Sequence, residues 1–478
     1  MKNSVMFLAG CLLAASCRQL GSSQSEAELS AFGTYVDSLD STVEGEWFTR
    51  MGVSADADSM LSYLRRELPR NGLDTTAFFL PQIAEDLWIV HTLAFDSVGQ
   101  SIGEVLKRLD GNLSKAYIDY TAGQRFGFMR PDKVLNRLDY KVGGSGYARL
   151  FDYEVKAPDY DESRRQMSTD DRMGYLVGSQ PQDYVYRALQ ACLDTARSQS
   201  VRRKIAVNME RCRWQMDRPE RQDRHILVNI PAQLLWAVGG DSVLDMRICC
   251  GAFPTKTPLL HSSVNLIQVN PEWIIPYNIV KSDVARHAGD SAYFARNHYS
   301  IIDRRSSDTL KAGSVTSDQL LSGNYRVVQA GGAGNSLGRI VVRFPNNFSV
   351  YLHDTNNRGA FQRDRRTLSH GCVRVQKPFE LACYMLPDAD DWMKDRLRIS
   401  MDIAPETDRG RDYLKEHSDD DCRPLRLINS KEVSPRIPVY IVYFTAYPNP
   451  STGKMELWPD RYEYDQAITK EISSFLLK

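Results

Sequence analysis

The spacing of apolar residues changes near residue 220, and this change restricts the chain to a fold with a helical part and a β part. Between about residues 25 and 215, apolar residues recur at helical spacing, as they do over 102–109. Ser101 and Glu104 form a capping-box pattern that predicts where this helix starts. After His225 the apolar residues alternate instead, which is typical of strands. We therefore expect an α+β fold, with further helices around 61–68, 185–196 and 201–212.

The second part of the chain predicts a series of short strands. Residues 226–230 and 234–238 alternate in polarity, and Gly239-Gly240 then separates the second run from 243–249, so a β-hairpin is expected there. The run 439–444 is rich in β-branched and aromatic residues, which favour strands. Helix-like sequence over 276–303 interrupts the series. Further strands are expected at 264–269, 324–329, 339–344 and 348–353.

Length and charge limit the organisation and the partners. A chain of 478 residues predicts roughly three structural units. The 60 basic and 60 acidic residues cancel, which argues against a dedicated nucleic-acid-binding protein. We expect a helical domain at 25–215 with an irregular connection at 141–182, a mostly β domain at 222–402 with an insertion at 276–320, and a C-terminal extension, 403–478, packing on the β domain.

The N-terminus has the pattern of an export signal. Lys2 precedes an apolar stretch, Val5 to Ala15, that is too short to span a bilayer. Small residues then lead to Cys17, as in a bacterial lipoprotein signal in which the cysteine is lipidated. Cys11 lies in a closer lipobox match but leaves a shorter apolar region, and ordinary signal cleavage is the third alternative. The pattern predicts a signal peptide at 1–17 and a mature protein outside the cytoplasm.

The nine cysteines do not form a zinc-binding pattern with the histidines. Seven remain beyond the signal region, and an odd count predicts at least one free thiol. Cys249-Cys250 and Cys383 lie in apolar segments and are expected in the core. Cys192 and Cys212 could pair with each other or with Cys422, and the sequence leaves these pairings open.

Residues that can perform chemistry are concentrated between 350 and 375. Cys372 needs a base or a positive charge nearby to become a nucleophilic thiolate. His353 lies at the end of a predicted strand, from which a turn could bring it beside the thiol. His370 is only two positions from the cysteine, so its ring is poorly placed to align on the sulfur. Gly371 allows the backbone to approach a substrate and to leave N–H groups for an oxyanion.

The string Ser369-His370-Gly371-Cys372-Val373-Arg374, preceded by His353, resembles the signature of the L,D-transpeptidase catalytic domain of the YkuD type. The resemblance extends over roughly 222–478 to the large multi-domain periplasmic members of that family, and the region 113–136 resembles their scaffold domain. No peptidoglycan-binding module is recognised. Further segments with counterparts in the family are 226–232, 257–258, 270–273, 334–339 and 438–446.

The resemblance implies a role for each residue of the motif. Cys372 would be the nucleophile and His353 the base, with a backbone carbonyl of Asp354 or a neighbour orienting the imidazole. The Asp354 carboxylate could instead cap a turn. The N–H groups of Gly371 and Cys372 are oxyanion candidates. Tyr351 has two alternatives: its hydroxyl joins these donors, or its ring simply packs on the strand.

The remaining motif residues have supporting roles in this interpretation. Ser369 and His370 would shape the turn and the substrate groove. Arg374 could bind a substrate carboxylate through bidentate contacts or form a structural salt bridge.

The implied reaction is acyl transfer without a metal or cofactor. Its partners would be the donor tetrapeptide and acceptor stem of peptidoglycan, and the product a 3→3 cross-link. The family implies a location in the periplasm or cell envelope, with membrane contact only through a lipid anchor, a capping subdomain at 276–320, and covalent inhibition by carbapenems. Alternatives are another acceptor (a protein amine, a D-amino acid or water) or a non-catalytic wall-binding scaffold.

Overall fold

The computed structural model describes residues 45–49, 52–138, 149–221, 223–240, 242–417 and 425–477. The proposed signal region with Cys11 and Cys17 lies outside these ranges, as does Cys422. The chain divides into two compact units. One contains the described residues up to Arg130 with Lys156–Gln215 and Ile468–Lys478, and the other contains Pro131–Val155 and Met216–Ala467.

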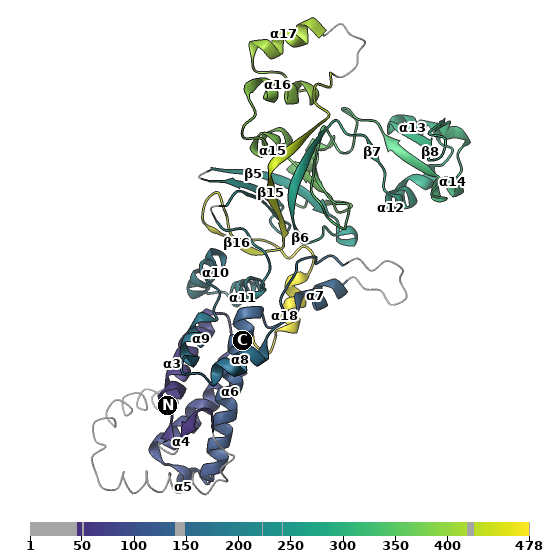
Figure 1. Ribbon diagram of the computed structural model, residues 1–478. Coiled ribbons are helices and arrows are strands. Elements are labelled where there is room, and N and C mark those ends of the chain that lie inside the picture. Colours follow the sequence, from purple (N-terminus) through teal and green to yellow (C-terminus); the bar gives the residue numbers. More distant parts are fainter. Residues whose placement is uncertain are drawn as a thin grey trace. The chain divides into compact units, whose positions relative to one another are not determined.

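The first unit is a helical bundle with its own core (Figure 1). The longest helix begins at the predicted capping box, where the Ser101 hydroxyl accepts a hydrogen bond from the Glu104 amide and the Glu104 carboxylate accepts one from the Ser101 amide. Apolar residues on one face of each helix meet in the core. The helices are α3 (Ala55–Arg70), α4 (Leu80–Thr92), α5 (Phe95–Val98), α6 (Ile102–Phe126), α8 (Tyr160–Met167), α9 (Arg172–Gly178), α10 (Tyr184–Thr195) and α11 (Gln199–Arg213); a short hairpin, β1 (Phe48–Thr49) and β2 (Gly52–Val53), precedes them.

The prediction of an irregular connection at 141–182 is wrong for the second half of this range, which contains α8 and α9. The Asp159 side chain accepts a hydrogen bond from the Glu162 amide and starts α8. Arg165 pairs with Glu162 one turn earlier. A helix of eight residues offers too few apolar positions for a clear period, so local polar contacts define it instead.

Two short segments of chain belong to a different unit from the one that the expected domain boundaries gave them. Residues 131–155, placed in the helical domain by the sequence, belong to the β unit: the Leu259 amide donates to the Leu150 carbonyl at 2.7 Å, and the Tyr153 hydroxyl donates to the Ile441 carbonyl at 3.3 Å. The end of the chain belongs instead to the helical unit, where Phe475 packs on Phe78 and Phe128. Contacts between distant segments decide both assignments.

The second unit is built on a closed eight-stranded barrel (Figure 1). The strand order is β5-β14-β12-β11-β6-β15-β3-β4, and β4 pairs with β5 to close it. β13 (Thr367–Ser369) is added outside this ring, parallel to β5. The barrel strands are β3 (His225–Asn229), β4 (Leu234–Gly239), β5 (Ser242–Gly251), β6 (Leu260–Val269), β11 (Ile340–Arg343), β12 (Leu352–His353), β14 (Val373–Val375) and β15 (Ser430–Val442).

The β domain does not end at residue 402 as expected, because β15 is a barrel strand. It lies between β3, to which it is parallel, and β6, to which it is antiparallel. A barrel without β15 would expose the hydrogen-bonding edges of both neighbours. The other elements after residue 375 are α15 (Pro378–Met385), α16 (Asp391–Ser400), α17 (Asp408–His417), β16 (Ala446–Pro448), β17 (Met455–Leu457) and α18 (Tyr464–Glu471).

The predicted hairpin around Gly239-Gly240 is present as β4 and β5, and Cys249 and Cys250 are fully buried on β5. The strand expected at 348–353 is reduced to Leu352–His353. Before this strand the Asn346 side chain, and not a neighbouring strand, forms hydrogen bonds with the backbone of Phe344, Phe348 and Val350. Cys383 is only partly buried, and Cys192 is a free thiol, so Cys192 and Cys212 are not bonded to each other.

The insertion expected at 276–320 forms a small layer with its own apolar core around Phe294, Ile301 and Val327. Its sheet has the order β7-β10-β8-β9, so the strand predicted at 324–329 belongs here and not in the barrel. A short π-helical turn, Val280–Val284, follows its first helix. The elements are β7 (Trp273–Ile274), α12 (Tyr277–Ile279), α13 (Ser291–Arg296), β8 (Tyr299–Asp303), β9 (Thr309–Leu310), α14 (Ser317–Leu321) and β10 (Tyr325–Gln329).

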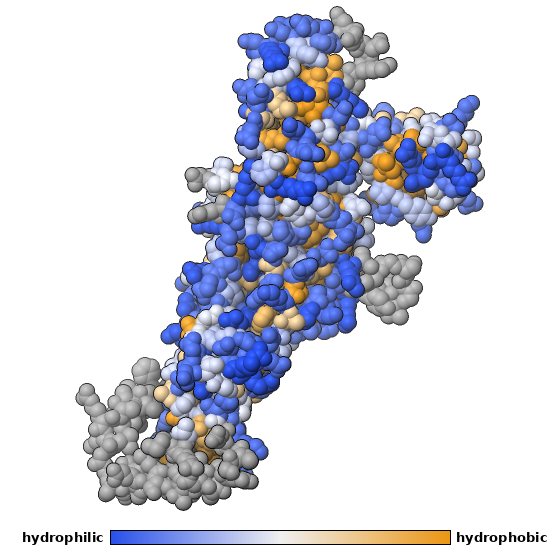
Figure 2. All heavy atoms as spheres, in the orientation of Figure 1, coloured by the Kyte–Doolittle hydropathy of each residue, from blue (hydrophilic) through white to orange (hydrophobic). Residues whose placement is uncertain are grey.

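The surface in the view of Figure 2 is mostly hydrophilic, with small hydrophobic patches that include one over the α16 region and one over the insertion. Within the part of the chain that the structure describes, no helix combines the length and the apolar character needed to cross a membrane.

Candidate active site

The motif residues lie at the ends of three strands of the barrel unit, of which β12 and β14 are direct neighbours and β13 is separated from β14 by β5. β13 ends at Ser369, and β14 begins directly after Cys372. β12 runs parallel to β14, with Leu352 opposite Val373. By the same register Tyr351 lies beside Cys372, and the Val373 amide donates to the Tyr351 carbonyl at 3.1 Å. The fold thus brings two segments 19 positions apart into direct contact.

A cavity of about 310 Å³ opens over this junction. Both His353 and Cys372 line it, together with Tyr351, His370 and Arg374. Ser369 of the motif also lines it. The other lining side chains were not among the predicted site residues, because they come from the insertion and the strand before it, from the loop before β11 and from the loop before β12, and only the family resemblance of 270–273 and 334–339 pointed to any of them. They include Trp273, Pro276, Asn278, Ile279, Ser336, Leu337, Phe348 and Ser349.

Cys372 is held as a neutral thiol. Its Sγ donates a long hydrogen bond to the Ser349 carbonyl at 3.8 Å. Burial raises the pKa of the Cys372 thiol to about 11, although contacts with the backbone and hydroxyl of Tyr351 and the charges of Arg343 and Arg374 act in the opposite direction. The thiol therefore needs a base within the cavity to become nucleophilic.

His353 is held as a neutral imidazole. The side chain is buried, and burial followed by the nearby Arg374 charge lowers its pKa to about 3. Backbone groups of Asp354 and Leu337 oppose this shift. Its Nδ1 has no hydrogen-bond partner of ordinary geometry among the described residues. A neutral imidazole is the form that can accept a proton, which is what a role of His353 as a base would require.

His370 is directed at another partner. Its Nε2 lies 3.3 Å from Oδ2 of Asp283 in the π-helical turn of the insertion, and both side chains are nearly half exposed. This contact connects the motif turn to the insertion. It also occupies the ring nitrogen that a role as base would require.

Ser369 and Gly371 shape the turn around the thiol. The Ser369 hydroxyl donates to the Cys372 carbonyl at 2.5 Å and accepts from the Gly371 amide at 3.2 Å. The Gly371 N–H, expected as an oxyanion donor, is therefore already engaged. Gly371 has φ +119°, a conformation that residues with a Cβ rarely adopt, whereas an added Cβ would meet only ordinary contacts at 3.7 and 3.8 Å.

The Asp354 carboxylate, which directly follows β12, stabilises the turn that leads into β11. It accepts from the Arg339 amide at 2.9 Å and pairs with Arg358 at 2.8 Å. Tyr351 packs edge-on against the His353 ring at 5.7 Å, while its hydroxyl contacts Cys372. Burial raises the Tyr351 pKa, so the phenol stays protonated and can donate.

Arg374 lines the cavity without an acidic partner. No carboxylate of the described residues forms an ion pair with it, and its Nε is buried without a hydrogen bond. A structural salt bridge, one of the two roles weighed for this residue, is thus absent from this part of the chain. The guanidinium leaves donors for an anionic or carbonyl group.

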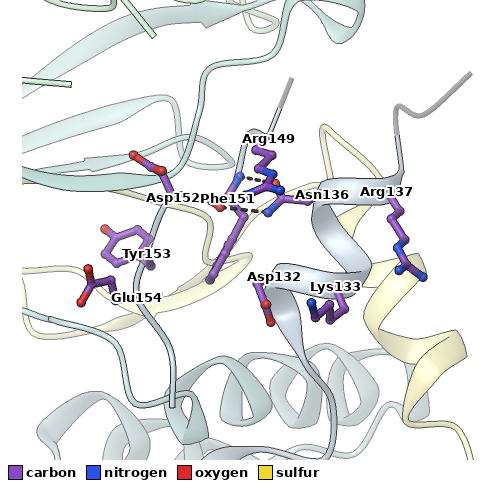
Figure 3. Close-up of a pocket in the computed structure, with 9 residues that line it drawn as sticks. All are labelled: Asp132, Lys133, Asn136, Arg137, Arg149, Phe151, Asp152, Tyr153 and Glu154. Carbon is purple, nitrogen blue, oxygen red and sulfur yellow. Dashed lines mark hydrogen bonds between the residues drawn. The ribbon is translucent and has the colours of Figure 1, made fainter. Parts of the chain in front are cut away.

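A larger cavity of about 780 Å³ lies elsewhere in the barrel unit, among residues of 132–154 (Figure 3). Asn136 brackets Phe151 there by two hydrogen bonds, from its Nδ2 to the Phe151 carbonyl and from the Phe151 amide to its Oδ1. Its described lining contains neither a thiol nor an imidazole, so it lacks a nucleophile–base pair. Among the described residues, no group of three or more His, Cys, Asp or Glu side chains is placed to hold a metal ion.

Comparison with known proteins identifies both units. Residues 223–394 match the L,D-transpeptidase catalytic domain of the YkuD family, and residues 45–193 match the Scaffold domain. A Haemophilus influenzae protein named "Putative L,D-transpeptidase" is 28% identical over 379 residues, which cover 76% of this chain and 71% of that protein. The chain therefore combines a Scaffold domain with an L,D-transpeptidase catalytic domain of the YkuD family.

Proposed function

We propose that this protein is a peptidoglycan L,D-transpeptidase that forms 3→3 cross-links through a thioester on Cys372. The observation that carries the proposal is that the only thiol lining the 310 Å³ cavity among the described residues is Cys372, which shares this cavity with a neutral, buried His353. Both residues lie within the segment that matches the catalytic domain. The donor would be a tetrapeptide stem and the acceptor a second stem.

In the first half-reaction Cys372 Sγ attacks the carbonyl carbon of the L,D-peptide bond after the third stem residue. The S–C bond forms as His353 takes the thiol proton, since a free thiolate is unfavourable at a pKa of about 11. The carbonyl electrons move onto oxygen. They return as the C–N bond breaks, and D-alanine leaves with the proton that His353 held.

The transferred proton is held inside the cavity from its removal from Cys372 until D-alanine carries it away. A protonated His353 is unfavourable beside Arg374 and in a buried site, so this state is stabilised only while negative charge is present on the sulfur or on the oxyanion. Proton transfer should therefore accompany bond formation and not precede it. The enzyme would rest as a neutral pair and not as a thiolate–imidazolium pair.

In the second half-reaction the side-chain amine of the acceptor stem attacks the thioester. The N–C bond forms and the C–S bond breaks, and His353 carries the amine proton back to the sulfur. Exclusion of water by the bound acceptor would favour the amine over hydrolysis. The unpaired Arg374 supports a role in binding a carbonyl or carboxylate group of a stem peptide.

The deciding experiment is mass spectrometry of the products formed by purified protein from disaccharide tetrapeptide. Release of D-alanine with a 3→3 dimer is expected. Release of D-alanine with only a tripeptide would identify water as the acceptor, and incorporation of an added D-amino acid would identify exchange. A protein that releases no D-alanine would contradict the proposal and favour a non-catalytic wall-binding role.

This substrate requires a location in the cell envelope, and we propose export by residues 1–17 followed by lipidation of Cys17. Two or three acyl chains give stable membrane anchoring, whereas one gives only marginal binding. Wild-type protein should partition with membranes and Cys17→Ala protein should not. If Cys11→Ala and not Cys17→Ala releases the protein, the lipidated residue is Cys11. A soluble wild type would indicate ordinary signal cleavage.

A further inference from the structure

The turn that carries Cys372 is fixed from behind by a loop that the chemistry does not use directly. This loop, residues 251–257, follows β5. The Ser369 carbonyl accepts from the Ala252 amide and from the Thr255 hydroxyl, each at 2.9 Å. The Thr257 hydroxyl donates to the Gly371 carbonyl at 2.8 Å. Two successive parts of the catalytic turn are therefore anchored on one loop.

Thr257 is itself held by a residue from far along the chain. Its hydroxyl accepts from the Gly251 amide at 2.8 Å, and its own amide donates to the Tyr462 hydroxyl at 3.2 Å. The Tyr462 hydroxyl in turn donates to the Gly251 carbonyl at 2.7 Å. Thr257 is 0% and Tyr462 1% exposed. The tyrosine thus closes the base of the loop, and it lies outside the segment 223–394 that matches the catalytic domain.

Tyr462 is also fixed on its far side. Its amide donates to the Tyr443 hydroxyl at 2.6 Å, and that hydroxyl donates to the Asp460 carboxylate at 2.6 Å. The ring of Tyr462 lies 5.9 Å from the Lys256 ammonium. These contacts do not involve the phenol oxygen of Tyr462, so a change that removes only this oxygen leaves the rest of the packing in place.

The anchored carbonyl has a consequence for the neighbouring amide. The C=O of Gly371 and the N–H of Cys372 belong to the same planar peptide group, in which they point in opposite directions. Binding of the carbonyl to Thr257 therefore turns the Cys372 N–H away from Thr257. Among the described residues this amide has no hydrogen-bond partner, whereas the Gly371 amide is occupied by Ser369.

We propose that Thr257 and Tyr462 are positioning residues that aim the backbone amide of Cys372 at the oxyanion of the acylation step. This inference rests on the proposed function, because it assumes that Cys372 is acylated. A donor aligned before the reaction stabilises the developing charge without reorganisation, and a displaced donor loses much of that effect. The hydroxyls of Thr257 and Tyr462 do not touch the substrate and act only through the turn.

Two reactions of the same thiol separate this role from general packing. Acylation of Cys372 by a carbapenem passes through an oxyanion, whereas alkylation by iodoacetamide does not. Both rates can be measured on the full-length protein by mass spectrometry of the peptide that contains Cys372. The ratio of the two rates then reports on oxyanion stabilisation and is independent of transpeptidase turnover.

The informative variants are Thr257→Val, which keeps the shape and removes the hydroxyl, and Thr257→Ser, which restores it. Loss of a whole oxyanion donor lowers the rate by about 10²–10³. Misalignment of one donor should lower the acylation rate by about tenfold or more. Thr257→Val should lower the acylation-to-alkylation ratio by that amount, and Thr257→Ser should return it to near the wild-type value. Tyr462→Phe should change the ratio in the same direction by a smaller factor.

The matched control is Tyr153→Phe, which removes a buried tyrosine–carbonyl hydrogen bond to Ile441 of β15 and none of the bonds of the loop, and should leave the ratio unchanged. If Thr257→Val does not fold, Tyr462→Phe decides the question. An unchanged ratio in the folded variants, or equal slowing of both reactions, would overturn the positioning role. A wild-type protein that is alkylated but never acylated at Cys372 would instead contradict the proposed function.

Discussion

The two units each bury a cluster of ionisable side chains, but the two clusters differ in how well their members are hydrogen bonded. In the helical unit Glu210 and Arg213 are almost fully buried on α11. Glu210 accepts from the amides of Phe128 and Met129 at 2.8 and 3.3 Å, from the Trp214 indole at 3.1 Å and from Arg213 at 3.4 Å. Its negative charge is compensated by four donors.

Arg213 is equally well compensated. It donates to Gln124 at 2.9 Å, to the Asn71 carbonyl at 2.7 Å and to the Tyr186 hydroxyl at 3.2 Å. The Gln124 amide nitrogen is left without a partner. This network ties α3, α6, α10 and α11 together, and a charge pair of this kind contributes to a unique arrangement of the helices.

The cavity of the barrel unit is built in the opposite way. Nδ1 of His353 and Nε of Arg374 are buried without hydrogen-bond partners among the described residues, and the Cys372 thiol makes a long hydrogen bond at 3.8 Å besides its contacts with Tyr351. Buried polar groups in proteins are normally satisfied, so unsatisfied ones need an explanation. In the helical cluster the charged groups of Glu210 and Arg213 are both hydrogen bonded and an amide nitrogen of Gln124 is left over, whereas the barrel cluster leaves nitrogens of His353 and Arg374 without a partner among the described residues.

The largest expected effect is loss of activity without loss of stability, and it tests the barrel side of this comparison. Cys372→Ala should reduce product to an undetectable level, since no other thiol among the described residues lines the cavity. The temperature of unfolding should stay close to that of the wild type. Cys383→Ala, at a partly buried thiol on α15, is the control that should keep activity. Turnover by folded Cys372→Ala protein would remove this residue from the mechanism.

The second prediction separates the two histidines. His353→Ala should lower kcat/KM by about 10²–10⁴, the usual contribution of a general base. His370→Ala removes a half-exposed contact with Asp283, worth about 0.2–1 kcal/mol, and part of the cavity wall, and should lower kcat/KM by no more than about fivefold. Steady-state kinetics of the two variants make the comparison, and a reversed order of the two effects would exchange their roles.

The third prediction tests the helical side. Arg213→Met leaves the Glu210 carboxylate buried without its cation and should lower the free energy of unfolding of the helical unit by about 3–5 kcal/mol. Arg70→Met, at a half-exposed arginine paired with Glu67 and Asp194, should change it by less than about 1 kcal/mol. Denaturant unfolding followed by far-UV circular dichroism gives both values. Similar small losses in the two variants would mean that the buried network does not stabilise the unit.

The fourth prediction concerns acid stability. Folded protein keeps His353 neutral down to a pKa of about 3, while the unfolded chain binds that proton near pH 6.5, so unfolding takes up a proton between these values and stability falls as the pH is lowered. From pH 6.5 to 5 the loss from this residue should be about 2 kcal/mol. His353→Gln, which does not titrate there, should lose about that much less than the wild type over the same interval. Parallel stability curves for the two proteins would show that His353 titrates normally.

The active-site motif could be predicted from the sequence because its residues are close together in the chain. The Ser369-to-Arg374 turn and the His353 strand end are local features, and the capping box at Ser101 is read in the same way. The weaker predictions depended on partners that local sequence does not name. The Gly371 amide is occupied by Ser369, and the Asp354 carboxylate is used by Arg339 and Arg358.

The order of a helical part before a β part, the helical and alternating periods, and the motif around His353 and Cys372 could all be recognised from the sequence. The tertiary structure alone decided that β15 closes the barrel, that residues 131–155 join it, that His370 faces Asp283, and that Tyr462 supports the catalytic turn. Periodicity and motifs arise from neighbours along the chain, where backbone geometry restricts each residue. Contacts between segments far apart in the chain depend instead on which surfaces pack together, and no local pattern records that choice.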